Sequence, residues 1–287
     1  MMRISANNTM RLQPKKSLGQ HFLNSRYVLE QIISASRIKM GEVILEIGPG
    51  TGVLTSALLQ AGANVVAVEK DDRAYELLGE RFPAECASEQ LNVIHGDILD
   101  QDIFKTRSSP LSKTSSGSYS IVANIPYYIT GAILEKFLED EPRPDRMVLL
   151  VQKEVAERIV ARAPDGKDHG KESVLSVSVK AFGTPKVVAH VPRGAFIPPP
   201  TVDSAILTVD DISDKRFRVG SIDAKKFFDI VRTGFAHKRK YLIRNLEPIM
   251  GMEHVNRIWK ELKLDKKVRA EDITVDQWFK IASFVTL

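Results

Sequence analysis

Short runs of valine, isoleucine and leucine recur along the chain, bounded by glycine, proline or charged residues. They predict seven buried strands, at residues 43–47, 64–68, 92–95, 120–123, 147–151, 186–190 and 205–209. Stretches with helical spacing of apolar residues alternate with them and predict helices at 26–38, 53–61, 72–82, 130–139, 152–162 and 173–182. Because these strands are rich in apolar residues and do not alternate between apolar and polar positions, the pattern predicts an α/β fold whose mostly parallel sheet is covered on both faces.

The end of the sheet and the region after it follow different patterns. Only PRGAFIPPPTVDS separates the last two strands, so we expect an antiparallel pair there. The serine-rich stretch 105–118 predicts a mobile loop, and from about residue 211 the apolar spacing becomes helical again. We therefore divide the chain into a basic N-terminal arm (1–25), an α/β domain (26–212) and a small basic helical domain (213–287).

Composition narrows the class of protein. The chain has 287 residues, of which 43% are hydrophobic and 27% charged, an ordinary globular balance. Its longest apolar runs have about five residues, against the roughly 20 that a membrane span needs. The N-terminus is basic and polar and lacks the apolar stretch of a secretory signal, although an acid-poor organellar presequence would look similar. We expect a cytoplasmic protein that does not contact membranes.

Metal and disulfide chemistry are not indicated. Cys86 is the only cysteine, so neither an internal disulfide nor a multi-thiolate zinc site can form. The six histidines are scattered without the i, i+4 pairing of helical metal sites. We therefore expect no metal.

The distribution of charge says more than its net value of +5. Residues 1–41 hold seven Lys and Arg against one acid, and residues 221–287 hold 14 basic against nine acidic residues. The middle, residues 42–220, carries a net charge of −6. A slightly acidic body between two basic ends suggests that a polyanion such as nucleic acid is held from the ends. The alternative interpretation is that the basic residues form solvated surfaces that serve only solubility.

A glycine-rich turn follows the first predicted strand of the sheet. The sequence EIGPGTG places glycines at 48, 50 and 52 before a predicted helix, where they allow close approach of a ligand to the backbone. The spacing is neither the G-x-G-x-x-G of dinucleotide folds nor a phosphate-binding P-loop. A nucleotide-like ligand is expected here, although such a turn can also be purely structural.

Acidic residues follow the next two predicted strands. Glu69 ends the second strand, where a carboxylate can accept both hydroxyl protons of a ribose, and Asp97 ends the third, where it could face an adenine amino group. Each acid alone could be a helix cap or a surface charge. Together with the glycine turn, however, they occupy the strand ends at which open α/β sheets bind ligands. The set resembles that of class I S-adenosylmethionine-dependent methyltransferases.

The fourth strand leads into Asn124-Ile125-Pro126-Tyr127, which fits an amino-nitrogen acceptor. The Asn124 side-chain oxygen and the Ile125 carbonyl can accept the two N–H groups of an adenine amine and so orient its lone pair. Pro126 stiffens the turn, and Tyr127 offers a ring face for stacking. Because the nitrogen becomes acidic only after methylation, positioning rather than a strong base should dominate. The alternative is an ordinary turn followed by core aromatic residues.

Motifs along nearly the whole chain resemble one family, the ribosomal RNA small-subunit adenine dimethyltransferases. The acceptor loop is similar to the N-[I/L]-P-Y motif of methyltransferases that act on amino nitrogens. The other matching segments are KKSLGQHFLNS (15–25), EIGPGTGVLT, VEKD, HGD, VQKEVAERIVARAPDGKDHG (151–170), PRGAFIPPPTVDSAIL (192–207) and FAHKRKYLIRNL (235–246). One departure is visible, because KESV (171–174) precedes LSVSV where the family proceeds almost directly to L-S-V.

The resemblance implies a cofactor, S-adenosyl-L-methionine, and a Rossmann-like class I fold with a mostly parallel seven-stranded sheet. It implies cofactor contacts at His21, Leu23, Gly48, Gly50, Glu69, Asp97 and Asn124. His21 stands where other members often have asparagine, so its contact is expected through the backbone or a substituted hydrogen bond, unless it is simply a surface residue. Phe196 would stack on the flipped adenine opposite Tyr127, or else be a hydrophobic plug before the proline-rich turn.

The implied reaction adds two methyl groups to the 6-amino group of each of two adjacent adenosines near the 3′ end of small-subunit ribosomal RNA. The partner would be the immature small subunit, and the enzyme is expected to act as a monomer. The resemblance also implies phosphate contacts on a basic C-terminal helix, at Lys238, Arg239, Lys240 and Arg244. A solvated helix face is the alternative for these four residues.

Three competing functions remain. Large-subunit adenine methyltransferases of the macrolide-resistance type share the glycine turn and the acceptor loop, but ARAPDGKDHG and PRGAFIPPPTVDS look more like the small-subunit enzymes. A non-catalytic ribosome-assembly or transcription factor on this fold would be expected to lose Asn124 or the Gly48 turn, and both are intact. A small-molecule methyltransferase would not explain the basic C-terminal region. A dual role as enzyme and assembly checkpoint stays compatible.

Overall fold

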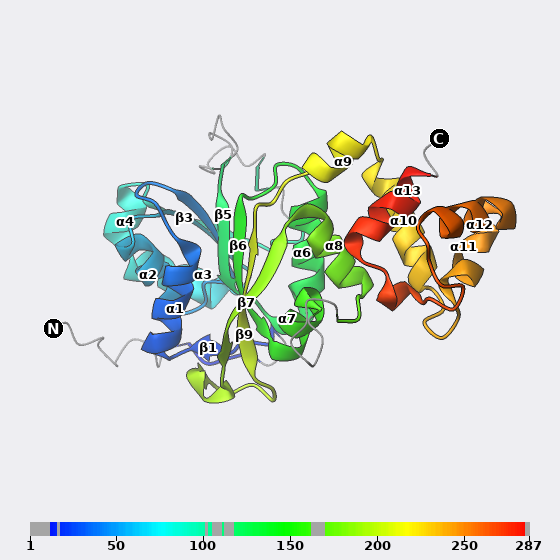
Figure 1. Cartoon of the computed structure of the whole chain (residues 1–287). Helices are drawn as coiled ribbons and strands as arrows, with labels where there is room; N and C mark the ends of the chain where they lie inside the picture. The colour runs from blue at the N-terminus through cyan, green and yellow to red at the C-terminus, as the bar shows by residue number, and fades with distance from the viewer. Residues whose placement is uncertain are drawn as a thin grey trace. The chain divides into compact units, whose positions relative to one another are not determined.

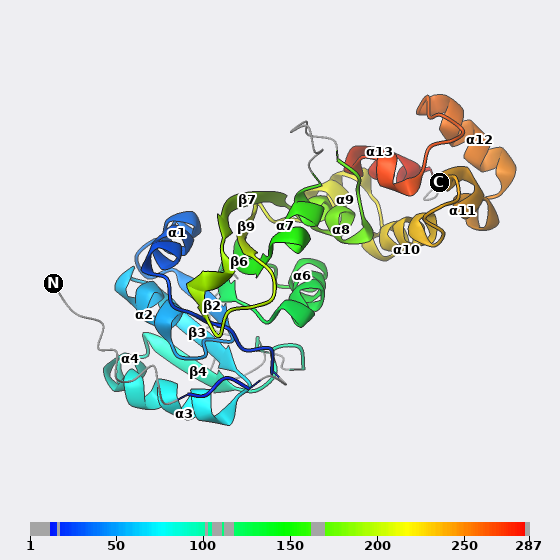
Figure 2. The same cartoon turned by 90° about the horizontal axis from the view of Figure 1, so that it is seen from below.

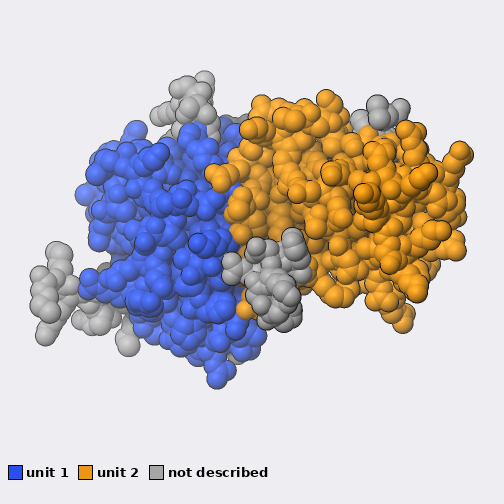
Figure 3. Space-filling model, viewed as in Figure 1, with its two compact units in different colours: residues 1–153, 186–210 blue, residues 154–185, 211–287 orange. Residues whose placement is uncertain are grey.

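The computed structural model describes residues 12–15, 18–100, 103–104, 111, 118–161 and 170–284 (Figure 1). Residues 1–11 of the predicted arm, and nearly all of the predicted loop 105–118, lie outside this range. The chain divides into two compact units, coloured separately in Figure 3. Unit 1 comprises residues 1–153 and 186–210, and unit 2 comprises residues 154–185 and 211–287.

A seven-stranded sheet forms the centre of unit 1, and its strand order is β4-β3-β2-β5-β6-β9-β7. The strands are β2 (Val43–Ile47), β3 (Asn64–Glu69), β4 (Leu91–His95), β5 (Ser120–Asn124), β6 (Arg146–Gln152), β7 (Thr184–Val191) and β9 (Ser204–Asp210). The strands from β4 to β6 are parallel, and β9 runs antiparallel to β6. The predicted mostly parallel sheet is therefore confirmed, each strand within two residues of its expected bounds, and the last two predicted strands are neighbours.

Helices of unit 1 pack on this sheet. They are α1 (Arg26–Ser36), α2 (Val53–Gln60), α3 (Asp72–Arg81), α4 (Pro83–Ala87) and α6 (Thr130–Glu139). Two short 3₁₀ helices lie in connections: η2 (Tyr127–Ile129) directly precedes α6, and η3 (Arg193–Ala195) follows β7. Figure 2 shows α1 and α6 on opposite faces of the sheet. The side chain of Ser25 caps α1 by accepting from the Val28 N–H, and the helix ends at Ser36 because the next residue, Arg37, adopts a left-handed conformation (φ 50°).

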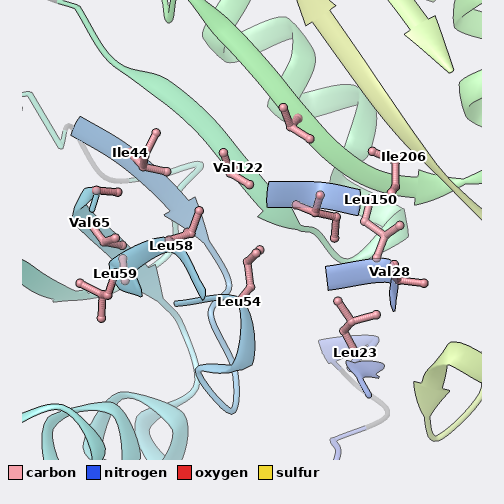
Figure 4. Close-up of a cluster of buried hydrophobic side chains, with 14 of the residues drawn as sticks. Leu23, Val28, Ile44, Leu54, Leu58, Leu59, Val65, Val122, Leu150 and Ile206 are labelled. Atoms are coloured by element: carbon pink, nitrogen blue, oxygen red, sulfur yellow. The ribbon is translucent and has the colours of Figure 1, made fainter. Parts of the chain in front are cut away.

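Apolar side chains from α1, α2, α3 and the strands of the main sheet form one buried cluster (Figure 4). Val28 of α1 and Leu58 of α2 lie over strand residues such as Ile44 and Leu150, all less than 5% exposed. Burial of each such side chain contributes about 1.5–3 kcal/mol. This cluster holds fixed the strand ends from which the candidate site is built.

A second, two-stranded sheet lies outside the main one. β1 (Phe22–Leu23) pairs antiparallel with β8 (Phe196–Ile197), with Phe22 opposite Ile197 and Leu23 opposite Phe196. Two residues carry no periodicity, so no pattern along the chain predicts these strands. Their pairing brings the N-terminal segment beside the proline-rich turn that follows Phe196.

Unit 2 is helical. It contains α7 (Lys153–Val160, apart from Lys153), α8 (Val174–Phe182), α9 (Lys215–Gly220), α10 (Ala224–Phe235), α11 (Leu242–Met250), α12 (Met252–Glu261), the 3₁₀ helix η4 (Ala270–Asp272) and α13 (Val275–Ser283). Phe182 of α8 packs 5.0 Å from Phe217 and 5.9 Å from Phe228, measured between ring centroids. The C-terminal helices thus share a core with α8, whereas the sequence-based division placed α8 in the α/β domain.

The departure at residues 171–174 forms the start of α8. The Ser173 hydroxyl accepts from the Ser176 N–H, and the Ser176 hydroxyl accepts from the Ser173 N–H, which is a capping box. Glu172 accepts from the Lys180 side chain at 2.6 Å, and Lys171 pairs with Glu271. The extra residues therefore build a helix start in unit 2.

The described residues contain neither a candidate membrane span nor a candidate metal cluster. Among the helices of residues 12–284 that the structure describes, none is long and apolar enough to cross a membrane. Across the same described residues, no group of three or more His, Cys, Asp or Glu side chains could hold a metal ion.

Candidate active site

A cavity in unit 1 opens at the carboxyl ends of β2, β3 and β5 and beside the residues that follow β4. Among the residues predicted for the cofactor, His21, Leu23, Gly48, Gly50, Glu69 and Asp97 line it. The whole acceptor loop, Asn124 to Tyr127, lines the same cavity. The structure thus brings together segments separated by up to about a hundred residues of sequence, at the sheet edge where open α/β folds bind ligands.

The glycine turn between β2 and α2 has backbone angles that favour glycine. Gly50 (φ 55°) and Gly52 (φ 76°) are both left-handed. A Cβ on Gly50 would lie 3.1 Å from the Phe22 ring, and one on Gly52 would lie 2.8 Å from the Phe82 ring. The turn therefore lies close to its neighbours, and its residues Gly48 to Thr51 line the cavity.

Glu69, at the end of β3, organises the turn. Its Oε2 accepts from the Gly50 N–H at 2.9 Å and its Oε1 accepts from the Asp71 N–H at 2.8 Å. Burial raises the pKa of this carboxyl, while the backbone hydrogen bonds act in the opposite direction. Each oxygen keeps a lone pair, so the group can still accept two hydroxyl protons from a diol.

Glu46 is a cavity residue that the sequence analysis did not select. Its side chain is 1% exposed, and its Oε2 has no hydrogen-bond partner among the residues that the structure describes. Burial, with a smaller contribution from the charge of Glu69, raises the pKa of Glu46 to about 8. The available signal was a lone acid inside the otherwise apolar strand VILEI.

Asp97 lies beyond the end of β4 at the same cavity. Its carboxylate accepts from the Lys70 ammonium at 2.6 Å and from the Leu99 N–H at 2.9 Å. The hydrogen bond from Lys70 is the main reason that the pKa of Asp97 is lowered. The carboxylate is therefore ionised and acts as an acceptor at neutral pH.

The acceptor loop is held rigidly. The Asn124 side-chain nitrogen donates to the His21 carbonyl at 3.1 Å. This contact uses the nitrogen end of the amide, so the side-chain oxygen is the end that can accept a hydrogen bond from a ligand. Ile125 is buried, and the Tyr127 hydroxyl lies 2.6 Å from the Ser204 hydroxyl, which fixes the ring. Burial raises the pKa of Tyr127, so the phenol stays neutral. The loop offers acceptors and an aromatic ring but no group suited to removing a proton.

His21 lies at the cavity through its backbone and its ring. Its carbonyl accepts from Asn124, its Nδ1 lies 2.8 Å from the Pro198 carbonyl, and its ring is stacked 6.0 Å from that of Tyr127. Both its backbone and its ring are therefore held beside the acceptor loop. A direct contact with the cofactor stays a prediction.

Phe196 does not reach the cavity in this structure. Its side chain is 2% exposed and belongs to the buried cluster, next to Leu23 in the β1–β8 pair. Stacking of Phe196 on the adenine therefore stays a prediction, because its ring packs in the core beside Leu23 in this structure. The alternative of a hydrophobic plug before the proline-rich turn describes the observed position.

The four predicted RNA-binding residues lie in unit 2, and all are exposed. Only Arg244 is on a helix, α11; Lys238, Arg239 and Lys240 lie in the turn between α10 and α11. The expectation that these residues share one basic helix is therefore wrong, because a turn separates α10 from α11. The Asn245 side chain holds this turn by donating to the Gly234 carbonyl at 2.6 Å.

Class I S-adenosylmethionine-dependent methyltransferases hold their cofactor with such an arrangement, in which a glycine turn follows the first strand of a parallel sheet and a buried acid ends the second. This chain is a member of that class, with a Rossmann-like fold. Within it, the chain belongs to the ribosomal RNA adenine dimethylase family, whose model matches residues 11–287.

Individual relatives agree with this assignment. Ribosomal RNA small subunit methyltransferase A of Dehalococcoides mccartyi (strain BAV1) is 37% identical over 94% of this chain and 88% of its own length. The protein of the same name from Rippkaea orientalis is 36% identical over 95% of this chain and 98% of its own length.

Two solved structures are similar in fold. A dimethyladenosine transferase from Plasmodium falciparum matches with a TM-score of 0.70 and 25% identity over 91% of this chain and 96% of its own. The 23S rRNA methyltransferase ErmE matches with a TM-score of 0.67 and 22% identity over 93% of this chain and all of its own. The second likeness concerns the fold alone.

Proposed function

We propose that this protein uses S-adenosylmethionine to dimethylate the 6-amino groups of two adjacent adenosines near the 3′ end of small-subunit ribosomal RNA. The observation that carries the proposal is that the acceptor loop, Asn124 to Tyr127, lines the same cavity as the glycine turn and Glu69. Family membership and the names of the curated relatives support the same substrate.

The cavity residues fit the cofactor. Its ribose diol would donate to Glu69, its adenine amino group to Asp97, and its methionine part would lie along the Gly48–Gly50 turn. The unpartnered Oε2 of Glu46 is suited to the α-ammonium group, the only cationic donor of that part. Leu23 and the His21 backbone would close the opposite wall. When bound, S-adenosylmethionine supplies an electrophilic methyl group on a sulfonium.

The acceptor loop would orient the target amine. The Asn124 side-chain oxygen and the Ile125 carbonyl accept the two N–H groups, so that the nitrogen lone pair points toward the methyl carbon. Tyr127 stacks on the base, and its ring is already fixed by Ser204. After transfer the nitrogen is strongly acidic and loses its proton to water. The absence of a basic side chain on this loop is therefore consistent with the reaction.

Phosphate contacts would come from unit 2. Lys238, Arg239, Lys240 and Arg244 are exposed cations on one turn and the helix after it. Such contacts contribute salt-dependent affinity more than base choice. We expect the enzyme to act as a monomer, and a substrate in assembling subunits would place the reaction in the cytoplasm. Cys86 is a free thiol, in keeping with a reducing compartment.

The experiment is transfer of labelled methyl from S-adenosylmethionine to small ribosomal subunits that lack the 3′-proximal dimethyladenosines, with large subunits in parallel. We expect label on the small subunit, approaching four methyl groups each. Label only on large-subunit RNA would assign the protein to the macrolide-resistance type. No label on either subunit would favour a non-catalytic assembly factor.

A further inference from the structure

Residues 18–23, here called the covering segment, form one wall of the cofactor cavity, and all six line it. The segment touches both halves of the site. Phe22 lies against the glycine turn, where a Cβ on Gly50 would be 3.1 Å from its ring. On the other side, the His21 carbonyl accepts from Asn124 of the acceptor loop. A cofactor in the cavity would therefore be covered by this segment.

Little regular structure holds the covering segment in place. Its only strand pairing in the described chain is the two-residue β1–β8 ladder, which a further hydrogen bond from the Asn24 N–H to the Ala195 carbonyl extends. A two-stranded ribbon of this length is not stable by itself in water. The N-terminal end of the segment, at residues 18–20, lies beyond that ladder and needs another attachment.

Asp71 provides this attachment. Its Oδ2 accepts from the Gln20 side-chain nitrogen at 3.0 Å, and its Oδ1 accepts from the Lys15 ammonium at 3.1 Å. The Asp71 side chain is fully buried, and Arg73 also donates to both oxygens. Hydrogen bonds from Arg73, Gln20 and Lys15 hold the pKa of Asp71 well below its usual range, so the carboxylate is charged. Charge-assisted hydrogen bonds of this kind are the stronger ones.

The same turn holds the acid expected to bind the ribose. The Asp71 N–H donates to Glu69 Oε1, and Glu69 Oε2 accepts from the Gly50 N–H. The residues at the end of β3 and just after it, Glu69 and Asp71, therefore hold both the glycine turn and the covering segment. The two attachments use different atoms of Asp71, the backbone for one and the side chain for the other.

We propose that Asp71 is a positioning residue that holds the covering segment over the bound cofactor through Gln20 and thereby sets how tightly S-adenosylmethionine and its product S-adenosylhomocysteine are retained. The inference rests on the proposed cofactor but not on the proposed RNA substrate. Asp71 itself does not line the cavity, so it acts through the segment. Weakening the attachment should speed cofactor dissociation without changing the chemistry of transfer.

The test compares S-adenosylhomocysteine binding to the full chain by calorimetry, without RNA, in four variants. Gln20→Ala removes the donor to Asp71, and we expect the dissociation constant to rise about tenfold, since one charge-assisted hydrogen bond is lost. Gln20→Lys offers an ammonium to the same carboxylate and should restore binding to near the wild-type value. Asp71→Asn removes the charge and should also weaken binding.

A matched control separates positioning from helix capping. Asp71 is the N-cap of α3, and Asp223 is the N-cap of α10 in unit 2, where its side chain accepts from the Lys226 N–H at 2.8 Å. Asp223→Asn perturbs the same kind of cap and should leave the dissociation constant unchanged. In methyl transfer, Gln20→Ala should raise KM for S-adenosylmethionine while kcat stays near that of the wild type.

The outcomes are distinct. Wild-type binding by Gln20→Ala, an equal loss in Gln20→Lys, or a fall in kcat at unchanged KM would each overturn the positioning role. A wild-type protein that binds S-adenosylhomocysteine but methylates no ribosomal subunit would overturn the proposed substrate and leave this inference standing. A wild-type protein that binds neither form of the cofactor would overturn both.

Discussion

The buried carboxyl of Glu46 makes a strong prediction about stability and pH. Its pKa is about 8 in the folded protein and 4.5 when unperturbed. Between these values the folded state holds a proton that the unfolded state has released, so stability falls as pH rises. The contribution is fully present below pH 4.5, declines through the window and levels off above pH 8. Replacement by glutamine, Glu46→Gln, removes the titration and should abolish this decline.

The size of the effect follows from the shift. Each pKa unit corresponds to about 1.4 kcal/mol, so between pH 5 and pH 8 the wild type should lose roughly 3.5 kcal/mol relative to Glu46→Gln. For a unit of this size that is a difference of roughly 7–14 °C in melting temperature. Other groups titrate in both proteins, so the difference between the two pH profiles isolates Glu46.

The assay is thermal unfolding of both cofactor-free proteins at several pH values from 5 to 8. Parallel profiles, or a wild type that gains stability relative to the variant as pH rises, would refute the account of a protonated buried acid. Infrared difference spectra provide a second measurement, because a protonated carboxyl has a C=O stretch that should disappear in Glu46→Gln at neutral pH.

Three further predictions concern the two units separately. Asn124→Ala should abolish methyl transfer while leaving RNA binding nearly intact, as measured by label incorporation and filter binding; transfer at a near-normal rate would mean that another group orients the amine. Lys238→Ala and Arg239→Ala should each reduce the slope of log affinity for RNA against log salt by about one, with unchanged slopes counting against phosphate contacts. Gly52→Ala should lower the free energy of unfolding by about 2 kcal/mol or more, because residue 52 has a φ of 76° and a Cβ there would lie 2.8 Å from the Phe82 ring; an unchanged free energy of unfolding would count against this account.

The strands of the main sheet could be predicted closely because each is marked by a run of apolar residues in its own sequence. The run at 43–47 is a strand with the predicted bounds, since all its residues but Glu46 are apolar and a glycine turn follows. Helix α1 ends two residues earlier than expected, at Ser36, because Arg37 takes a left-handed conformation that apolar periodicity does not reveal. Where a pattern extends over a full element, sequence reasoning therefore succeeded.

The features that sequence reasoning missed depend on contacts between distant segments. The packing of Phe196 in the core beside Leu23, far away in the chain, follows from the pairing of β8 with β1. The attachment of Gln20 to Asp71 joins residues 51 positions apart. Such contacts leave no local signal, whereas the acids that end strands, such as Glu69, could be selected because each follows a recognisable strand.

The division of the chain has a consequence for truncation. Helix α8 precedes β7 in the sequence, yet it packs with α9, α10 and α13 of unit 2. Cutting the chain after Asp210 would therefore not release an intact helical unit. The C-terminal fragment would lack α8, and the remaining fragment would carry Phe182 stripped of its partners Phe217 and Phe228. Both fragments would present apolar surface to water, so limited proteolysis at this junction should yield aggregating pieces rather than two soluble domains.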